Sequence, residues 1–366
     1  MIPRIKHFLL FASLWIAAAV QHAAAQTHHL YVAAESEDKV YQISFDAQTR
    51  ETAVRDVITV GQYPTENEGP HGINIGLNGK YWYLSIAHGN PYGWLYKFRT
   101  GTNEFIARTE LGMFPASLEA SAATGLLYVV NFNLHGDMEP SMVSVVDPGA
   151  MTVVAEITTG IMPHGSRISC DGRHQYHVSM MTDELIEVNT AAMKISRRLS
   201  VTPPRSRTAP SGPSETPVKS PAAKPTWADP HPAAKLVYVA NNKSNEVVEV
   251  DTDSWSVRRR FKTGSGPYNL EVSPNGKWMV VSYKGEGSTG VWNLQTGREA
   301  AKIANSRSIP HGVTISPDSR YAFVSVEGIG GEAGSVDVID LEQMERVAVL
   351  EVGKQAGGII YWKTTD

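Results

Sequence analysis

The architecture of the chain can be read from one stretch, Ile309-Pro310-His311-Gly312-Val313-Thr314-Ile315-Ser316-Pro317-Asp318-Ser319-Arg320-Tyr321-Ala322-Phe323-Val324. It is one of six copies of a repeated unit, and the other copies open at Pro70, Pro115, Pro163, Pro225 and Pro267. In every copy an aromatic or β-branched residue lies thirteen positions after the opening proline. A constant spacing inside a longer period indicates a repeat protein.

Each unit has the pattern of four antiparallel strands. An opening strand follows the proline, a turn rich in Asn, Asp and Gly comes next, and a second strand is centred on the aromatic residue. The turns include Asn78-Gly79 and Asn275-Gly276, which favour tight hairpins. A third strand, such as Val247–Asp251, and a fourth complete the unit. Four strands in roughly 40–50 residues are typical of a propeller blade.

The two ends of the chain complement each other. The first unit, which begins near His29, lacks an opening strand, and the C-terminal residues 355–362 resemble an opening strand with no blade after it. Pairing these segments would close the ring and hide the sheet edges of an open array. We therefore predict an all-β, seven-bladed propeller that forms a single domain over residues 26–366, closed by a C-terminal strand that completes the first blade.

One interval between units is too long. Successive opening prolines lie 42 to 48 residues apart, except that Pro225 follows Pro163 by 62 residues. The excess falls in residues 202–224, which are rich in proline and have no apolar period. Proline removes ladder donors, and such a composition cannot form a packed core. We predict a disordered insertion between blades 4 and 5.

The N-terminus has the pattern of a secretion signal. Arg4 and Lys6 precede an apolar run over residues 8–20, and small residues at 23–25 suit a signal peptidase. The run is shorter than the roughly 20 residues that a membrane span needs. We expect residues 1–25 to be removed, no span to remain, and the mature protein to be periplasmic or secreted.

The composition excludes some partners. The chain has 37 acidic and 33 basic residues and a formal net charge of −4, which gives no reason to expect nucleic-acid binding.

Cys170 is the single cysteine, so no intrachain disulfide can form and packing must stabilise the fold. We expect a monomer.

Two segments carry a resemblance to a known family. Tyr128-Val129-Val130-Asn131 and Tyr238-Val239-Ala240-Asn241 resemble the signature of the YVTN-repeat family of secreted seven-bladed propellers. The Pro-His-Gly and Ser-Pro-Asp phrasing is similar too, although the segment 323–326 lacks the asparagine. The resemblance implies the fold and leaves the function open. Related propellers include lactonases, lyases, a haem-binding nitrite reductase domain and the copper-bearing domain of nitrous oxide reductase.

The candidate site lies at one mouth of the central channel. We define the top face as the face where the first strand of each blade begins and where the loop between its second and third strands ends. The residues after the opening prolines should ring this mouth, and they are His71, Ala116, His164, Thr226, Tyr268, His311 and, from the closing strand, Ala356. The loops add His88, His135 and Glu327. The candidate ligand-binding residues are His71, His88, His135, His164, Tyr268 and His311.

Several functions fit this ring. The mouth can bind a small ligand or a protein partner. It can instead hold copper or iron with His71, His164 and His311 as ligands, because imidazole suits both metals and an oxidoreductase needs an open position. A metal-free lactonase or lyase would use a ring histidine as general acid–base with Glu68 or Glu327 as its partner.

A purely structural interpretation also stands. The histidine nitrogen can hydrogen-bond the backbone of a neighbouring blade, and the following glycine lets first strands approach each other at the axis. The sequence does not decide whether the protein is an enzyme.

Overall fold

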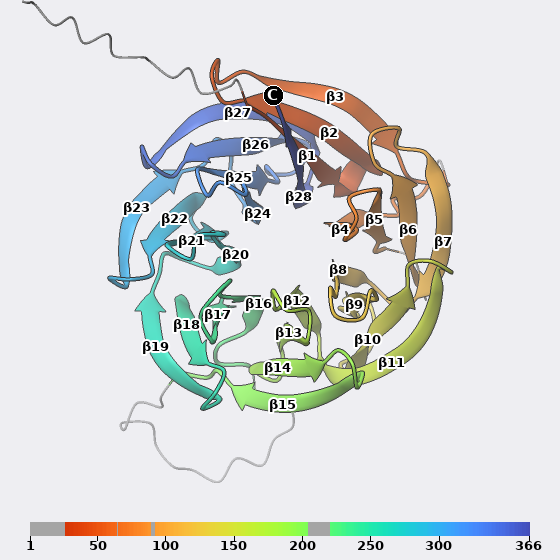
Figure 1. Ribbon diagram of the computed structural model, residues 1–366, viewed down its shortest axis with the longest axis vertical. Coiled ribbons are helices and arrows are strands. Elements are labelled where there is room, and N and C mark those ends of the chain that lie inside the picture. Colours follow the sequence, from red (N-terminus) through yellow and green to blue (C-terminus); the bar gives the residue numbers. More distant parts are fainter. Residues whose placement is uncertain (1–25, 64, 89–91, 204–219) are drawn as a thin grey trace, which may run out of the picture.

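The fold is a closed ring of seven four-stranded antiparallel sheets, as predicted (Figure 1). The computed structural model describes residues 26–63, 65–88, 92–203 and 220–366. The predicted signal segment 1–25, and residues 204–219 of the predicted insertion, lie outside the described residues. No helix in the described ranges is long and apolar enough to cross a membrane.

In each blade the first strand is innermost and the fourth lies on the outer rim (Figure 1). Blade 1 consists of β28 (Ala356–Thr365), β1 (Thr27–Ala34), β2 (Lys39–Asp46) and β3 (Thr52–Thr59), with the short helix η1 (Glu35–Glu37) between β1 and β2. Blade 2 consists of β4 (Pro70–Ile75), β5 (Tyr81–Ile86), β6 (Gly93–Arg99) and β7 (Phe105–Leu111). Blade 3 consists of β8 (Pro115–Ala120), β9 (Leu127–Asn131), β10 (Pro140–Asp147) and β11 (Thr152–Ile161).

The remaining four blades follow the same order around the ring. Blade 4 consists of β12 (Pro163–Ile168), β13 (His174–Ser179), β14 (Glu184–Asn189) and β15 (Lys194–Ser200). Blade 5 consists of β16 (Pro225–Pro230), β17 (Leu236–Asn241), β18 (Glu246–Asp251) and β19 (Ser256–Lys262). Blade 6 consists of β20 (Pro267–Val272), β21 (Trp278–Tyr283), β22 (Ser288–Asn293) and β23 (Arg298–Ala304). Blade 7 consists of β24 (Pro310–Ile315), β25 (Tyr321–Val326), β26 (Ala333–Asp340) and β27 (Glu345–Lys354).

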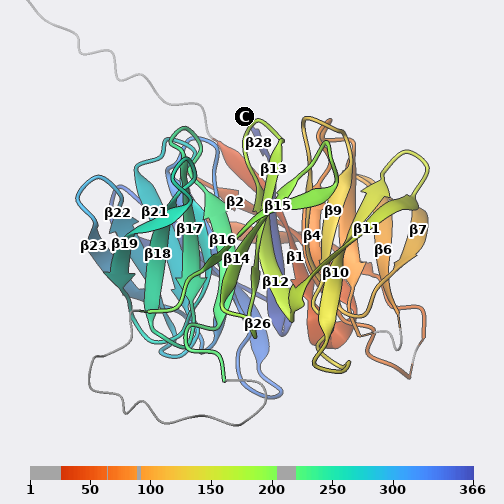
Figure 2. The same ribbon diagram turned by 90° about the horizontal axis from the view of Figure 1, so that it is seen from below.

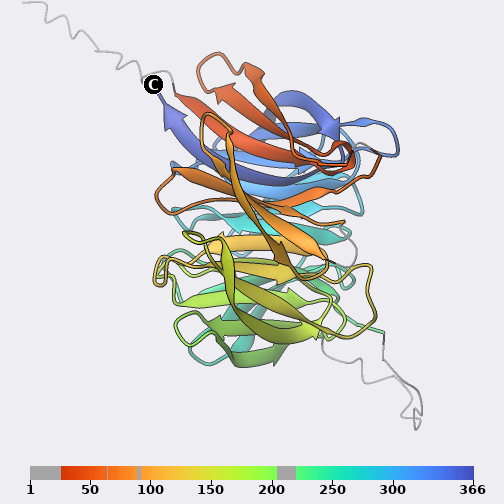
Figure 3. The same ribbon diagram turned by 90° about the vertical axis from the view of Figure 1, so that its right-hand side faces the viewer.

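Blade 1 closes the ring, as the complementary ends of the sequence predicted. The C-terminal strand β28 pairs antiparallel with the N-terminal strand β1, from Thr27 opposite Thr365 to Ala34 opposite Ala356 (Figure 3). A buried histidine reinforces the pairing, since His28 Nδ1 lies 2.8 Å from the Tyr361 hydroxyl. His29 Nε2 lies 3.0 Å from the Thr365 hydroxyl oxygen, so the closure rests on backbone pairing and on side-chain contacts between the two ends of the chain.

The first strands approach each other closely around the axis. At Gly72 an added Cβ would lie 2.6 Å from the Ala116 carbonyl oxygen of the next blade, and at Gly312 it would lie 2.7 Å from the Gly357 oxygen. Only glycine fits such an approach without displacing the neighbouring strand. The expectation that the glycine of the Pro-His-Gly phrase permits this contact is confirmed.

Serine hydroxyls complete the packing at the axis. The ladder shifts register just after the opening proline, which frees the glycine amide from strand pairing. Ser85 Oγ accepts a hydrogen bond from the Gly72 amide at 2.8 Å, and Ser325 Oγ accepts one from the Gly312 amide at 2.9 Å. Ser282 Oγ, at the same place in blade 6, donates to the His311 carbonyl oxygen at 2.8 Å. These hydroxyls therefore satisfy backbone groups that the register shift leaves unpaired.

Loop residues fix where three of the first strands begin. Side-chain oxygens in the loops between second and third strands accept hydrogen bonds from amides just before the next opening proline. The pairs are Asp38 with Gly69, Asp183 with Lys224, and Asn245 with Gly266, each with 2.8 Å between oxygen and nitrogen. Each acceptor residue has a positive φ, which Asn and Asp tolerate better than most residues. In blades 2, 5 and 6 the residue after the opening proline is thereby held at the top mouth.

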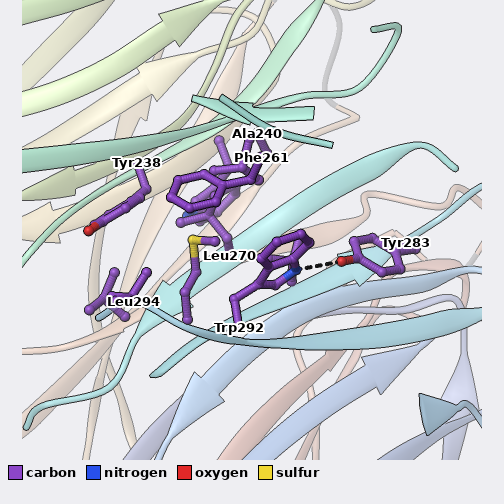
Figure 4. Packing of buried hydrophobic residues seen from close by; sticks show 12 residues of the cluster. Tyr238, Ala240, Phe261, Leu270, Tyr283, Trp292 and Leu294 are labelled. Atoms are coloured by element: carbon purple, nitrogen blue, oxygen red, sulfur yellow. Dashed lines mark hydrogen bonds between the residues drawn. The ribbon is translucent and has the colours of Figure 1, made fainter. Parts of the chain in front are cut away.

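Apolar side chains fill the wedges between blades, which stand side by side with their loops at the two faces (Figure 2). Figure 4 shows the cluster between blades 5 and 6, where Phe261 and Leu270 pack with Trp292. The Trp292 indole donates to the Tyr283 hydroxyl at 2.7 Å, so the buried polar tip of this side chain is satisfied. Burial of large rings between neighbouring sheets is the main favourable contribution to stability.

The close approach at the axis makes a testable prediction. Gly72→Ala should destabilise the fold by about 1–3 kcal/mol, because the added methyl group must displace the Ala116 carbonyl. Gly331→Ala is the matched control, since no atom lies within 4 Å of its added Cβ. Chemical denaturation measures both free energies of unfolding. Equal values for the two variants would contradict the packing argument.

A second prediction concerns a buried histidine in blade 4. His177 is fully buried, and burial lowers its pKa to about 3. Protons therefore bind the unfolded chain preferentially, so the free energy of unfolding should fall as the pH drops below about 6.5. From pH 7 to pH 5 this one group should cost about 2 kcal/mol.

The variant His177→Gln should remove that part of the pH dependence. Urea denaturation of the wild type and the variant at pH 7 and pH 5 gives the two differences. His135→Gln, on an exposed loop, should keep the wild-type difference. An unchanged pH dependence in His177→Gln would show that this histidine is not the group responsible.

Candidate ligand-binding site at the top mouth

Three histidines from separate blades lie around the channel axis at the top face. His71, His164 and His311 are each the second residue of a first strand, in β4, β12 and β24. The ring centroid of His71 lies 6.1 Å from that of His164 and 5.7 Å from that of His311, with interplanar angles of 89° and 72°. All three are buried. The repeat therefore brings residues that are far apart in sequence to one place.

One nitrogen of each imidazole is held by the protein. His71 Nδ1 lies 2.8 Å from the Ala116 carbonyl oxygen, and His164 Nδ1 lies 2.9 Å from the Thr226 carbonyl oxygen. Because a carbonyl oxygen only accepts, each Nδ1 carries the proton. His311 Nδ1 lies 2.6 Å from a Glu327 carboxylate oxygen. The Nε2 atoms are therefore the nitrogens available to a ligand.

The environment keeps two of these imidazoles uncharged. Burial, together with the neighbouring His71, lowers the pKa of His164 to about 3. Burial also lowers the pKa of His311, in spite of the Glu327 carboxylate. At neutral pH, Nε2 of both side chains thus carries a lone pair and acts as a hydrogen-bond acceptor or a Lewis base.

A charged pair supports one side of the ring. Lys284 Nζ lies 2.6 Å from Glu327 Oε1 and 4.3 Å from the centroid of the Tyr268 ring. Burial opposes ionisation of Glu327, but hydrogen bonds from His311 and Lys284 lower its pKa to about 2. The Tyr268 hydroxyl lies 3.2 Å from His164 Nε2. Tyr268 and the Glu327–Lys284 pair therefore link the side chains of blades 6, 7 and 4.

A second group lies beside the ring in blades 1 to 3. Glu35 in η1 is 3% exposed, and its Oε1 lies 2.7 Å from His88 Nε2. His88 Nδ1 lies 3.2 Å from His135 Nε2, and Glu35 Oε2 lies 3.9 Å from His71 Nε2. Burial raises the pKa of Glu35, yet the charges of His71 and His88 lower it below its ordinary value overall. Glu35 is therefore an ionised carboxylate that connects the loop histidines to the ring.

The structure thus brings together all six candidate residues in two contiguous groups, His71, His164, Tyr268 and His311 in the ring, and His88 and His135 beside it. Of the two carboxylates considered as partners of a histidine, Glu327 has that contact. The Glu68 carboxylate instead accepts a hydrogen bond from the Gln62 amide at 2.7 Å.

Sequence reasoning missed Glu35 and Lys284. Both occupy the same position in the repeat as Glu327, four residues after the aligned aromatic or β-branched residue of the second strand. Glu35, for example, lies four residues after Tyr31. An alignment of these loops, with the incomplete first unit included, would have found them. Glu35 lies in the incomplete first unit, and a lysine is not expected among metal ligands or acid–base pairs, so neither residue stands out from the sequence.

The metal site remains a prediction. Across the described ranges, no group of three or more His, Cys, Asp or Glu side chains is placed so that it could hold a metal ion. The donor set nevertheless suits a transition metal, because metal-ligating histidines commonly donate their other N–H to a carbonyl or a carboxylate. His71, His164 and His311 all have that anchoring.

The comparisons with known proteins identify the fold of the chain and no more. No protein-family model and no curated protein matches the sequence. A chain of hydrazine synthase from Kuenenia stuttgartiensis is 16% identical, with a TM-score of 0.64 over 81% of this chain and 92% of that chain. A protein from Lactobacillus plantarum is 12% identical, with a TM-score of 0.74 over 92% and 100% of the two chains.

A third solved structure has a functional description. The putative 6-phosphogluconolactonase from Bacteroides fragilis is 12% identical, with a TM-score of 0.70 over 94% of this chain and 99% of that chain. At such low identity these structures share the fold, and fold alone does not define chemistry. The chain is a seven-bladed β-propeller with a histidine-lined top mouth.

The hydrogen bonds at the mouth predict the tautomers of two side chains. At pH 7, His164 and His311 should be neutral and protonated at Nδ1, because burial lowers the pKa of both and an acceptor faces each Nδ1. Long-range ¹H–¹⁵N NMR of the imidazoles distinguishes the two tautomers, and His164→Ala and His311→Ala assign the signals. Protonation at Nε2 would contradict the arrangement described here.

Proposed function

We propose that the protein is an exported propeller that binds a small ligand at the top mouth through Nε2 of His71, His164 and His311. One observation carries this proposal: an acceptor in the protein fixes Nδ1 of all three imidazoles. A histidine whose only role was to tie neighbouring blades together would use Nδ1 for that contact, and its Nε2 would need no partner at the channel axis. Here the Nε2 atoms of the three imidazoles share one mouth, and that of His164 also accepts a hydrogen bond from the Tyr268 hydroxyl at 3.2 Å.

The chemistry of the mouth favours a ligand that donates hydrogen bonds. The neutral imidazoles of His164 and His311 offer lone pairs at Nε2, and the Glu35 and Glu327 carboxylates add acceptors. Aromatic rings bound the same space, with Phe132 4.7 Å from His164 and Phe114 5.4 Å from His71 between centroids. Such a mixture of apolar walls and a few polar groups is typical of a small-molecule site. A polyol or an amine fits this pattern.

A titration with sorbitol as the probe tests the ligand proposal. The Nε2 resonances of His164 and His311 should shift with saturation in the wild type. The double variant His71→Ala/His164→Ala should lose saturable binding, while Glu345→Gln on the outer strand β27 should keep it. If neither sorbitol nor an alkylammonium ion moves these resonances, the mouth is not a site for hydrogen-bond donors.

A metal-dependent oxidoreductase is the second candidate, because the anchored Nδ1 atoms give the three imidazoles the arrangement that metal ligands use. Copper or iron would be held by His71, His164 and His311, and it would supply Lewis-acid or redox chemistry there. The Glu327 carboxylate would orient His311, and Glu35 would lie next to the open side.

Elemental analysis of untagged mature protein tests the metal assignment. We expect about one copper or iron per chain, or stoichiometric uptake at micromolar concentration, with loss in His71→Ala/His164→Ala. If the protein contained neither metal and took up neither, the assignment of these histidines as metal ligands would be overturned. The proposal that the mouth binds a ligand through hydrogen bonds would then remain.

A metal-free lactonase or lyase is a third candidate, favoured by the hydrogen bond between His311 and Glu327. A carboxylate that orients a histidine is the arrangement that general acid–base catalysis requires. Such an enzyme should show a bell-shaped dependence of rate on pH with a lactone such as glucono-δ-lactone. Glu327→Gln should lower kcat more than it changes KM.

Export and family membership complete the proposal. The basic, apolar and small-residue order of residues 1–25 supports a periplasmic or secreted location, and the Tyr-Val-x-Asn segments support kinship with YVTN-repeat propellers. The mature protein is proposed to be monomeric, with a small molecule or a protein as the partner of the top face. Mass spectrometry of the secreted protein would show an N-terminus at Gln26.

A further inference from the structure

Below the histidine ring the central channel contains two adjoining cavities. The upper one, which we call the chamber, has a volume of about 40 Å³. The lower one, which we call the vestibule, has a volume of about 550 Å³. Ile73 and Arg167 line both. Turn residues such as Pro274 and Pro317, between first and second strands, also line the vestibule, so it lies at the face opposite the histidines.

The vestibule has an excess of negative charge. One repeat position, four residues after the opening proline, supplies Asn74, Glu119, Arg167, Asp229, Glu271 and Thr314, all of which line this cavity. Three carboxylates face one guanidinium, so the fully ionised group has a charge of −2. An unbalanced charge in a partly buried cavity is costly unless a counter-ion is bound.

The carboxylates are held in place but not satisfied. Asp229 Oδ2 accepts the Val272 amide at 2.7 Å, and Glu271 Oε1 accepts the Ile315 amide at 2.9 Å. The other oxygen of each carboxylate lies near Arg167, at 3.9 Å for Asp229 and 3.6 Å for Glu271. Both distances exceed that of a hydrogen bond. These oxygens therefore keep acceptor capacity toward the cavity.

Two buried amide oxygens along the same channel also lack a donor. Asn269 is 3% exposed and lines the chamber, and its Oδ1 has no hydrogen-bond partner among the described residues. Asn74 Oδ1, in the vestibule, is buried and has no partner in the same part of the chain. Buried acceptors are normally satisfied. Their presence in one channel indicates a guest that carries several hydrogen-bond donors.

The walls of the vestibule are apolar. They include four prolines, together with isoleucine and tyrosine side chains, namely Pro230, Pro232, Pro274, Pro317, Ile168, Ile315, Ile360 and Tyr361. A bare inorganic cation gains nothing from such walls. In the described residues no three acidic or histidine side chains are placed to hold a metal ion. The cavity therefore fits an ion with a hydrocarbon body.

We propose that this lower channel binds an organic cation, a primary ammonium or guanidinium group on an apolar body. The charged head donates hydrogen bonds to Asp229, Glu271 and the free amide oxygens, and the body packs against the proline-lined wall. When all three carboxyl groups are ionised, Arg167 balances one of them and leaves two to attract the ligand. His71 and His311 of the ring line part of the chamber, so the two sites adjoin, but a ligand of the vestibule need not reach the top face.

Titration of the full mature protein with n-butylammonium tests the proposal, with n-butanol as the uncharged control. Isothermal calorimetry should show saturable binding of the ammonium and binding of the alcohol weaker by at least about tenfold, because charge-assisted hydrogen bonds are about twice as strong as neutral ones. Equal binding of the two probes, or no saturable ammonium binding at millimolar concentration, would overturn the proposal. Displacement by equimolar Mg²⁺ would identify a metal site instead and overturn it too.

Isosteric variants locate the site. Asp229→Asn/Glu271→Gln removes two charges at constant volume and should weaken n-butylammonium binding by at least about tenfold. Glu345→Gln, on the outer strand β27, should bind as the wild type does. Unchanged binding by the double variant would place the cation elsewhere and overturn the assignment. Circular dichroism verifies the fold.

The pH dependence of binding needs no variant. Burial raises the pKa of Asp229 to about 6, of Glu119 to about 7 and of Glu271 to about 8. The other ionisable groups on the cavity wall are Arg167, the Cys170 thiol and the Tyr361 phenol. Binding of n-butylammonium should therefore strengthen from pH 6 to pH 8.5 and release protons, which calorimetry in buffers of different ionisation enthalpy measures. Affinity that does not change over this range would contradict the proposed head-group contacts.

Discussion

The close contact between first strands at the axis is the constraint on which the structure depends. Gly72 and Gly312 lie so near the next blade that a methyl group would meet a carbonyl oxygen. The preceding histidine is thereby fixed at the top mouth, and serine hydroxyls pair the backbone groups that the register shift leaves free. The same short segment, Pro-His-Gly, therefore serves packing through its glycine, and in the function proposed above its imidazole would serve recognition.

Residues at the same position of successive first strands lie at the same level of the channel. Residues directly after the opening proline form the histidine ring, and residues three positions later form the vestibule with its carboxylates. Neutral imidazoles at one end and an excess of acid at the other give the channel two chemically different mouths. The two ligands proposed for these mouths differ in chemistry, and one domain would bind both.

The sequence predicted the number of blades, their closure and the six candidate residues, because a fixed period converts directly into position around a ring. It did not predict the partners of those residues. Glu35 lies in the incomplete first unit, and its contact with His88 depends on how blades 1 and 2 meet. Lys284 and Arg167 stand at regular repeat positions, but the residue type at those positions differs from blade to blade. Their roles depend on the carboxylates that neighbouring blades place around them.

The pairing of β1 with β28 also determines how the protein responds to force. Thr27 lies opposite Thr365, so the two ends of the folded chain are adjacent. A load applied to both ends would open that pair first and then separate the two strands one residue pair at a time, as a zipper opens. Resistance to such peeling is low compared with shearing many hydrogen bonds at once. Joining the ends covalently would remove this weak point, and the ring could then be cut at any exposed loop to create new termini.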